Sequence, residues 1–512
     1  MSDEPVRPAG SPPGPPQQSL HEQAVVGFVW AAAQKWLVRI STLLAFILLG
    51  RLLTPEEFGV VALAMTIITV LTVLTDAGFT LWLIQHRRLN DAATSTAFWI
   101  SGALGLVLAG ALAAAAGPVA DLFDSAELRV ILPVLALSVV VAGLSSVPAA
   151  LLQREMRFRD LAIRQVVATV ASVVVAVVLA LLGAGVWALV AQTLVRVCVA
   201  TVILWWKSDF RPRFVFSLQE ARAMTGYGAK SLGVALGGAF RDQGEAFMIG
   251  ALVGTTALGF WTIAGRLVYV VVELGSAAVG SVAAPLFAKL QDDPARLTRA
   301  YSRTLSAGSL ILVPAMVALA LSSRELVPLV FGPQWVASGE VAGVLAGGML
   351  FTGLGAFHRA ALLGVGRAGA ELWVTVIAIT GQVLVVVLLS SQSLVVIAAG
   401  LSTWAAVTFV VRAVAVRITL GIGFASYHQL LALLLAGGAA AATVLAVDML
   451  LEPEGVVRLV WVGLLGGTVF VLVGWLVARP TFREVLRDVT RILRRRQASP
   501  TADPTPDPGP RR

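Results

Sequence analysis

The sequence predicts an all-α protein that crosses a membrane many times. Of its 512 residues 58% are hydrophobic, and the mean hydropathy is +0.86. Only 13% are charged, whereas soluble proteins carry roughly 25%. Long apolar stretches alternate with short connections, and every second connection is rich in arginine and lysine. Because short basic connections stay in the cytoplasm, this alternation also predicts the orientation of the chain.

The basic connections differ clearly from the intervening ones. Their cations are Arg87, Arg88, Arg154, Arg157, Arg159, Arg164, Lys207, Arg211, Arg213, Arg222, Lys230, Lys289, Arg296, Arg299, Arg303, Arg359, Arg367, Arg412 and Arg417. The intervening connections contain only Arg51, Arg129, Arg324 and Arg458. The net charge of +9 therefore indicates topology and attraction to anionic lipid, and we expect no nucleic-acid partner.

The apolar stretches are long enough to be membrane-spanning helices. A hydrocarbon core about 30 Å thick requires roughly 20 apolar residues in each helix, and this length rule gives about 14 spans. They are 25–49, 59–84, 96–117, 130–150, 161–182, 185–206, 228–251, 257–283, 304–322, 340–358, 371–390, 394–417, 428–449 and 456–478. An even number places both termini on the cytoplasmic side. The stretches 25–49 and 228–251 are the least apolar.

Matching residues recur at one offset along the chain, which predicts two related halves. The pairs are Gly50 with Gly250, Leu52 with Leu252, Gly59 with Gly259 and Ala64 with Ala264. We expect two six-helix lobes and a two-helix extension. The predicted divisions are an N-lobe over 25–206, a cytoplasmic linker over 207–227, a C-lobe over 228–420 and two further helices over 421–479.

The two ends of the chain have a different composition. Residues 480–496 place apolar residues and arginines at helical spacing, which is typical of an amphipathic helix lying on the membrane surface. The alternative is a solvated basic tail. The proline-rich tails 1–24 and 497–512 are expected to be disordered.

Several motifs, in order along the chain, resemble those of a known family. They are GRLLTPEEFGVVALAMTII (Gly50–Ile68), LTDAGFTLWLIQ (Leu74–Gln85), LLQREMRFRDLA (Leu151–Ala162), RDQGEAFMIGALVGTTALGFWTIAGRL (Arg241–Leu267) and APLFAKLQDDPARLTRAY (Ala284–Tyr301). The chain resembles polysaccharide-biosynthesis flippases of the Wzx type, within the MATE-like MOP superfamily, over roughly residues 25–420.

The resemblance implies an alternating-access transporter of the bacterial cytoplasmic membrane. Its relatives move undecaprenyl-pyrophosphate-linked oligosaccharide from the inner to the outer leaflet for lipopolysaccharide and exopolysaccharide. The implied partners are this lipid-linked oligosaccharide, membrane lipids and a glycan polymerase or export machinery.

The first span contains the best candidate for a headgroup site. Lys35 and Arg39 are four residues apart and therefore share a helix face, which Thr42 continues. Pyrophosphate needs fixed cations, and arginine offers planar bidentate donors. The alternative is that both side chains extend to the inner membrane surface.

Other charges inside the spans are further candidates, because each is costly there. Arg241 could bind the pyrophosphate or pair with Glu245, and Asp242 and Glu245 could couple transport to a cation. Arg266 and Glu273, seven residues apart on one face, could contact the headgroup and a coupling cation or join two helices as a salt bridge. Asp76 could couple, or bond the backbone of a neighbouring helix. His358 and Arg359 are expected to be interfacial.

Other function classes find less support. No Walker motif appears and no glycine-rich run follows a strand, so we expect no nucleotide site or other cofactor. Cys198 is the single cysteine and no histidine cluster suggests a metal. A glycan polymerase or ligase would need a large outer loop, so we expect no enzyme. A MATE-type drug exporter would need an anionic cavity. A lipid II flippase remains the third alternative.

Overall fold

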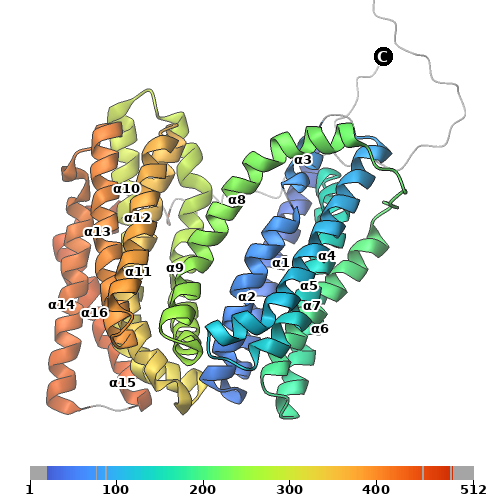
Figure 1. The fold of residues 1–512 in the computed structure, drawn as a ribbon. Helices are drawn as coiled ribbons and strands as arrows, with labels where there is room; N and C mark the ends of the chain where they lie inside the picture. The colour runs from blue at the N-terminus through green and yellow to red at the C-terminus, as the bar shows by residue number, and fades with distance from the viewer. Residues whose placement is uncertain are drawn as a thin grey trace, which may run out of the picture. The chain divides into compact units, whose positions relative to one another are not determined.

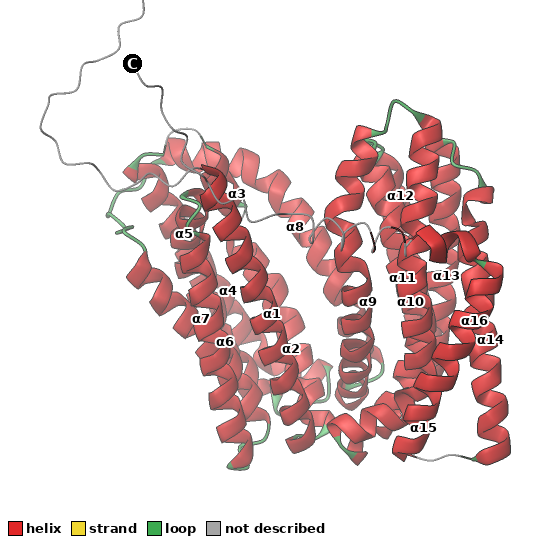
Figure 2. Ribbon diagram, turned by 180° about the vertical axis from the view of Figure 1, so that it is seen from behind, coloured by secondary structure: helices red, strands yellow, loops and turns green. Residues whose placement is uncertain are grey.

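The regular structure of this protein is helical wherever it is described. The computed structural model describes residues 20–76, 78–86, 89–452 and 455–484, together with residues 487 and 490. Within these ranges every regular element is a helix, which confirms the predicted fold class (Figure 2). The helices form two compact units. Unit 1 ends at Phe247 and unit 2 begins at Met248.

Unit 1 contains the first half of the helices, and its last helix continues into unit 2. In chain order the helices are α1 (Leu20–Leu52), α2 (Pro55–Asp76), α3 (Phe79–Gln85), α4 (Asp91–Leu122), α5 (Leu128–Arg154), α6 (Phe158–Leu181), α7 (Val186–Lys207) and α8 (Leu218–Leu252). Three pairs form its framework: α4 packs along α5, α6 along α7 and α1 along α6 (Figure 1). α5 also contacts α2 and α7.

The second predicted span is broken rather than continuous. α2 ends at Asp76, and Gly78 adopts a left-handed conformation with φ of 73° before α3 begins. Non-glycine residues rarely adopt this conformation, so Gly78 permits the bend. A Cβ here would also lie 2.6 Å from the carbonyl oxygen of Gly228 on α8. The span predicted over 59–84 is therefore corrected to one long and one short helix.

The connection after α7, residues 208–217, is hydrogen-bonded to α4 and is named here the strap. The indole of Trp99 on α4 donates to the carbonyl of Arg213 at 2.9 Å. The backbone N–H groups of Arg213 and Ser217 donate to the hydroxyls of Ser95 and Thr96 at 3.1 and 3.0 Å. These bonds tie 208–217 to the start of α4, and α8 already begins at Leu218.

Unit 2 repeats part of the packing of unit 1. Its helices are α9 (Thr255–Lys289), α10 (Pro294–Phe331), η1 (Pro333–Trp335), α11 (Val336–Gly364), α12 (Ala368–Leu389), α13 (Leu394–Leu420), η2 (Phe424–Tyr427), α14 (His428–Leu451), α15 (Gly455–Trp461), the π-helix η3 (Val462–Gly466) and α16 (Gly467–Val477). The contacts α4–α5, α6–α7 and α5–α7 recur here as α10–α11, α12–α13 and α11–α13. The two halves therefore share an architecture, to which unit 2 adds α14 and α15–α16.

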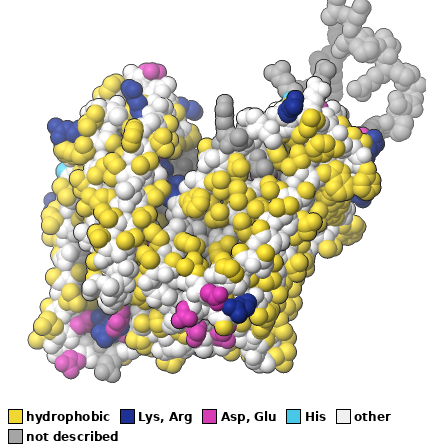
Figure 3. Space-filling view, viewed as in Figure 1, with side chains coloured by type: hydrophobic (Ala, Val, Ile, Leu, Met, Phe, Trp, Pro, Cys, Tyr) yellow, Lys and Arg dark blue, Asp and Glu magenta, His cyan; other side chains and the backbone are white. Residues whose placement is uncertain are grey.

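Twelve helical segments in the described ranges are long and apolar enough to cross a membrane. The two predicted spans outside this set are those of α1 and α8, which contain the least apolar predicted stretches. Apolar side chains cover the flanks of each unit, and charged side chains gather toward the ends (Figure 3). In both units the basic connections lie at one end, named here the basic end, and the opposite end is named the acidic end.

Many of the cations assigned to connections lie inside helices instead, and Arg164 and Arg412 are two examples. Arg164 is in the second turn of α6, and Arg412 lies two turns before the end of α13 with 7% of its surface exposed. Helix ends are set by tertiary packing and capping, which the hydropathy pattern does not show. Residues 479–484 are helical, and Phe482 packs on Trp475 with ring centroids 5.9 Å apart. Most of the predicted amphipathic helix and most of both predicted tails lie outside the described residues, but residues 20–24 of the first tail form the start of α1.

Candidate functional site: charged side chains within the helices

The two cations of the first span lie on α1, which packs against α6. Arg39 is half-buried, and its guanidinium lies over the indole of Trp36, 5.5 Å from the ring centroid. The side chain of Lys35 lies outside the described residues. The hydroxyl of Thr42 donates to the carbonyl of Val38 at 2.7 Å, one turn back on the same helix. The structure thus places Arg39 in the interior of α1, half-buried and over an aromatic ring.

Asp76 connects the two pieces of the broken span. Its carboxylate accepts hydrogen bonds from the backbone N–H of Thr80 at 3.2 Å and from the hydroxyl of the same residue. A carboxylate in this position satisfies a free N–H group in the first turn of α3. This geometry agrees with the structural alternative for Asp76, and ion coupling by Asp76 stays a prediction.

Two of the three charged side chains predicted as site residues on α8 form an ion pair with each other. Arg241 Nε donates to Asp242 Oδ1 at 2.9 Å, and the two side chains are 44% and 61% exposed. Glu245 is half-buried. Arg241 thus pairs with its neighbour in the sequence, Asp242. The sequence had suggested a pair with Glu245, four residues away. An exposed pair such as Arg241 with Asp242 contributes little stability, so both groups remain available to a ligand.

Arg266 and Glu273 lie on α9 and are both half-buried. They belong to unit 2, whereas the other predicted site residues belong to unit 1. The structure therefore brings Lys35 and Arg39 onto one helix and Arg241, Asp242 and Glu245 onto another, and it leaves the roles of all eight residues as predictions.

Unit 2 contains a buried ion pair that the sequence did not single out. Arg412 Nε and Nη2 donate to both oxygens of Glu371 at 3.1 and 3.0 Å, and both side chains are 8% exposed. Arg359 approaches the same carboxylate at 3.4 Å, and the hydroxyl of Thr375 donates to it at 3.2 Å. Bidentate pairing with further hydrogen bonds is what a buried charge requires. The only sequence signal was a glutamate in the first turn of an otherwise apolar span.

His358 is buried beside this pair with no exposed surface, whereas Arg359, predicted with it to be interfacial, is 42% exposed. The Nε2 atom of His358 lies 2.9 Å from the hydroxyl of Tyr427, which lies 2.8 Å from the hydroxyl of Tyr301. The hydroxyl of Ser302 donates to the carbonyl of Ser426 at 3.0 Å. These bonds fix the turn η2 against α10 and α11 and so position α14.

A second ion cluster holds the added helices at the acidic end of unit 2. Arg458 on α15 contacts Glu325 on α10 and lies 2.9 Å from Asp448 on α14. All three side chains are at most 21% exposed. This cluster and the bonds at Tyr427 attach α14 and α15–α16 to the rest of unit 2 at both ends.

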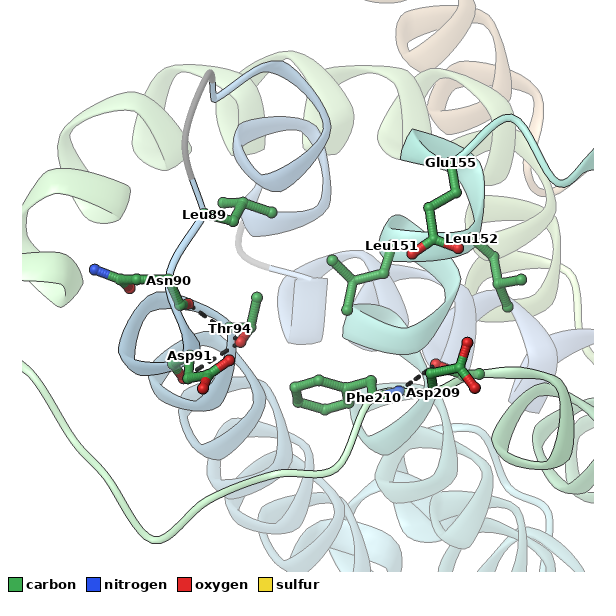
Figure 4. Close-up of a pocket in the computed structure, with 10 residues that line it drawn as sticks. Leu89, Asn90, Asp91, Thr94, Leu151, Leu152, Glu155, Asp209 and Phe210 are labelled. Carbon is green, nitrogen blue, oxygen red and sulfur yellow. Dashed lines mark hydrogen bonds between the residues drawn. The ribbon is translucent and has the colours of Figure 1, made fainter. Parts of the chain in front are cut away.

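A cavity of about 240 Å³ lies at the basic end of unit 1 (Figure 4). Its carboxylates are Asp91 on α4, Glu155 after α5 and Asp209 in the strap. Arg213 pairs with Asp91 at 2.7 Å, and Arg157 approaches Glu155 and Asp209 at 3.5 and 3.7 Å. The carboxylates thus have cationic partners, and the cavity is part of the strap's attachment. Among the described residues, no group of three or more acidic, histidine or cysteine side chains could hold a metal ion.

The chain is similar to known polysaccharide biosynthesis proteins. A family model described as "Polysaccharide biosynthesis protein" matches residues 48–340. The succinoglycan biosynthesis transport protein ExoT of Rhizobium meliloti (strain 1021) is 30% identical over 299 residues, which are 58% of this chain and 60% of that protein. The lipopolysaccharide biosynthesis protein WzxC of Escherichia coli (strain K12) is 24% identical over 319 residues, 62% of this chain and 65% of that protein. The chain therefore matches less than two thirds of the length of either relative.

Solved structures share the fold, among them the following two. The lipid II flippase MurJ in an inward closed conformation has a TM-score of 0.73 at 11% identity, covering 89% of this chain and 100% of that chain. An inward-facing multidrug resistance MATE family transporter of the MOP superfamily has a TM-score of 0.58 at 18% identity, covering 75% of this chain and 94% of that one. These likenesses confirm the predicted MATE-like fold. With the apolar helices, they identify a multi-pass membrane protein.

Proposed function

Because this chain belongs to the polysaccharide biosynthesis protein family, we propose that it is a flippase for undecaprenyl-pyrophosphate-linked oligosaccharide in the bacterial cytoplasmic membrane. The family match over residues 48–340 carries this proposal. The names of two relatives, a succinoglycan transport protein and a lipopolysaccharide biosynthesis protein, support a cell-surface polysaccharide as the final product.

A cationic site inside the membrane is what this substrate requires. Moving a pyrophosphate through an apolar layer is costly unless fixed charges accompany it. Arg39 supplies a guanidinium about 20 Å from the Leu52 end of α1, counted at 1.5 Å per residue. Lys35, one turn away on the same face, adds a second cation. In our proposal these two residues bind the headgroup, with Arg241 and Arg266 as later contacts.

Transport requires a cycle of states and a source of energy. Two compact units with related packing support an alternating-access cycle. A cation gradient or the membrane potential would drive the return step, with Asp242, Glu245 and Glu273 as coupling candidates. A coupling ion must bind the two states with different affinity. Asp76 is a weaker candidate because its carboxylate already accepts two hydrogen bonds.

The orientation follows from the positive-inside rule. The basic ends would face the cytoplasm, with both termini on that side. A glycan polymerase or export machinery would then receive the substrate at the acidic ends. The chain would itself perform no bond-making step.

Two alternatives share this fold, because fold alone does not determine the substrate. A MATE-type drug exporter carries cationic compounds and would need anionic groups where α1 presents Lys35 and Arg39. A lipid II flippase would also need a cationic site, so only the identity of the glycan separates it from our proposal.

The experiment that tests the proposal is a deletion of this gene in its own host, with a complemented strain as control. We expect undecaprenyl-linked repeat units to accumulate and the surface polymer to disappear, and mass spectrometry of the lipid fraction would identify the glycan. Unchanged glycans with altered drug accumulation would contradict the proposal and favour the exporter. Loss of viability with accumulated lipid II would favour the third function.

A further inference from the structure

Two arginines inside unit 1 stand apart from the predicted site. Arg164 lies on α6 and Arg196 on α7, and these two helices form a closely packed hairpin. Arg196 is in the middle of its helix. At 1.5 Å per residue it lies about 15 Å from the start of α7 at Val186 and about 16 Å from its end at Lys207. That depth is too great for its guanidinium to reach either membrane surface easily.

The turn that joins α6 to α7 and the turn that joins α1 to α2 lie side by side at the acidic end of unit 1. A Cβ at Gly185, in the turn between α6 and α7, would meet the carboxylate of Glu57 in the first turn of α2. Further along, the hydroxyl of Thr193 lies 3.7 Å from the sulfur of Met65 on α2. Arg196 follows Thr193 by three residues, so it lies on the face of α7 that turns toward α2.

With the acidic ends level, the depths of the cations can be compared. Counting from that end, Arg196 lies at about 15 Å, Arg39 at about 20 Å, and Arg164 and the backbone position of Lys35 at about 26 Å. Successive cations thus differ in depth by about one helical turn. Because α1 packs on α6 and α6 on α7, the series belongs to three adjacent helices.

The two arginines lack the partners that buried cations normally have. The Nε atom of Arg164 is buried and has no hydrogen-bond partner. Arg196 makes no hydrogen bond or ion pair with the residues that the structure describes. Arg196 has exposed surface in the structure. Both arginines are therefore cations without a fixed anion among the described residues.

The matching hairpin of unit 2 shows what a neutralised arrangement looks like. There α12 and α13 pack in the same way, and Arg412 on α13 is paired with Glu371 on α12. In unit 1 both members of the hairpin carry cations instead. A cation kept in apolar surroundings without a counter-charge is costly, and a bound anion removes that cost.

We propose that Arg196 is the centre of an anion subsite within unit 1 and that this subsite binds a phosphate or diphosphate group. Arg164 and Arg39 are the neighbouring cations of the subsite, at other depths. The choice of a phosphate over another anion rests on the proposed function, whereas the existence of the subsite rests on unit 1 alone. Guanidinium groups at successive depths give a diphosphate bidentate partners at each level.

The test uses the purified full chain in nanodiscs and the charged thiol reagent MTSES, which reacts only in water. Ala200→Cys, one turn from Arg196 on the same face of α7, is made in a Cys198→Ser background, which removes the only native thiol and keeps Arg196. We expect MTSES to label the new cysteine, and inorganic pyrophosphate to slow the labelling about tenfold at about 90% occupancy. Sodium chloride at matched ionic strength should have no such effect. Val202→Cys, an exposed apolar position of α7, is the control that should not react.

Two outcomes overturn the proposal. If Ala200→Cys reacts only with a lipid-soluble maleimide, this face of α7 is turned to lipid. If it reacts with MTSES without protection by pyrophosphate, the site binds no phosphate, and protection by glucuronate alone would assign a sugar carboxylate instead. Neither result depends on glycan export, so the subsite can fail while the proposed function stands, and the reverse.

A second measurement covers the case in which the cysteine variant does not fold. Pyrophosphate binding is titrated by calorimetry against the wild-type chain, Arg196→Gln and Arg129→Gln, whose exposed arginine pairs with Asp121. We expect the Kd to rise at least about tenfold for Arg196→Gln and to stay within about twofold for Arg129→Gln. Equal affinities for all three proteins would overturn the proposal.

Discussion

The two hairpins α6–α7 and α12–α13 occupy similar places in their units. They differ in that the arginine of α12–α13 is paired with a carboxylate and the arginines of α6–α7 are not. In unit 2 Arg412 is buried against Glu371, with Arg359 and Thr375 completing the carboxylate's partners. In unit 1 Arg164 and Arg196 have no carboxylate among the described residues. A paired charge fixes two helices together, whereas a cation kept without its counter-charge is suited to a ligand. The paired charges of unit 2 are thus structural, whereas we propose that the unpaired cations of unit 1 bind a ligand.

The largest expected effect comes from breaking the buried pair. Glu371→Gln would leave Arg412 without its counter-charge, so we expect the chain to lose about 3–5 kcal/mol of stability. Glu340→Gln is the control, since Glu340 lies 3.5 Å from Arg324 in an exposed pair, and it should cost less than about 1 kcal/mol. Thermal unfolding of the purified proteins measures both. Equal losses would mean that the pair in unit 2 is not structural.

The corresponding change in unit 1 should affect transport and not folding. Arg39→Ala removes a charged contact with the headgroup worth about 1.5–3 kcal/mol, so we expect surface polysaccharide to fall roughly 10- to 100-fold. The amount of protein in the membrane should stay normal. Arg129→Ala, outside the spans, is the control, and export should be unchanged. Normal export by the Arg39 variant would remove this residue from the site.

A smaller effect should follow from loosening the hydrogen bonds beside the buried pair. Tyr427→Phe removes the hydroxyl that lies between His358 and Tyr301 and leaves both without a partner in this chain of bonds. We expect a loss of about 1–3 kcal/mol, because both groups are buried. Tyr301→Phe breaks one of the two contacts and should cost less. If thermal unfolding gives the opposite order, the tyrosines do not act in this chain.

The smallest effect concerns pH and the acidic end of unit 1. Burial raises the pKa of Glu127 above its ordinary value of 4.5, and the charges of Glu56 and Glu57 raise it further. The folded chain therefore holds this proton more tightly than the unfolded chain, and stability falls as the pH rises through the folded pKa. Below pH 4.5 the proton stays on Glu127 in both the folded and the unfolded chain, so Glu127→Gln should match the wild type. At pH values above the folded pKa of Glu127 the variant should be more stable than the wild type. Because the side chain is exposed, the gain should stay below about 1 kcal/mol.

The measurement for Glu127 is the melting temperature between pH 4 and pH 8, which spans the window around its pKa. Glu340→Gln in unit 2 serves again as the control. A difference between Glu127→Gln and wild type that is the same at every pH would show that the proton on Glu127 is not responsible.

Part of the candidate site could be predicted from the sequence, and part could not. Lys35 and Arg39 were visible because two cations in an apolar span share a helix face. Arg196 is a lone arginine in such a span, and nothing in its local pattern distinguishes it from a packed residue. The strap 208–217 looked like a linker because its bonds to Trp99, Ser95 and Thr96 join residues far apart in the chain.

The sequence by itself determined that the protein is helical and crosses a membrane, because hydropathy and helix length are local properties set by the thickness of the hydrocarbon layer. Residues that recur at one offset predicted two related halves with the second beginning at 228, whereas the compact units divide between Phe247 and Met248, inside α8. Only the tertiary structure decided which charges are neutralised. Arg412 looked like a loop cation until α12 brought Glu371 to it, because pairing depends on which helices pack together and at what depth.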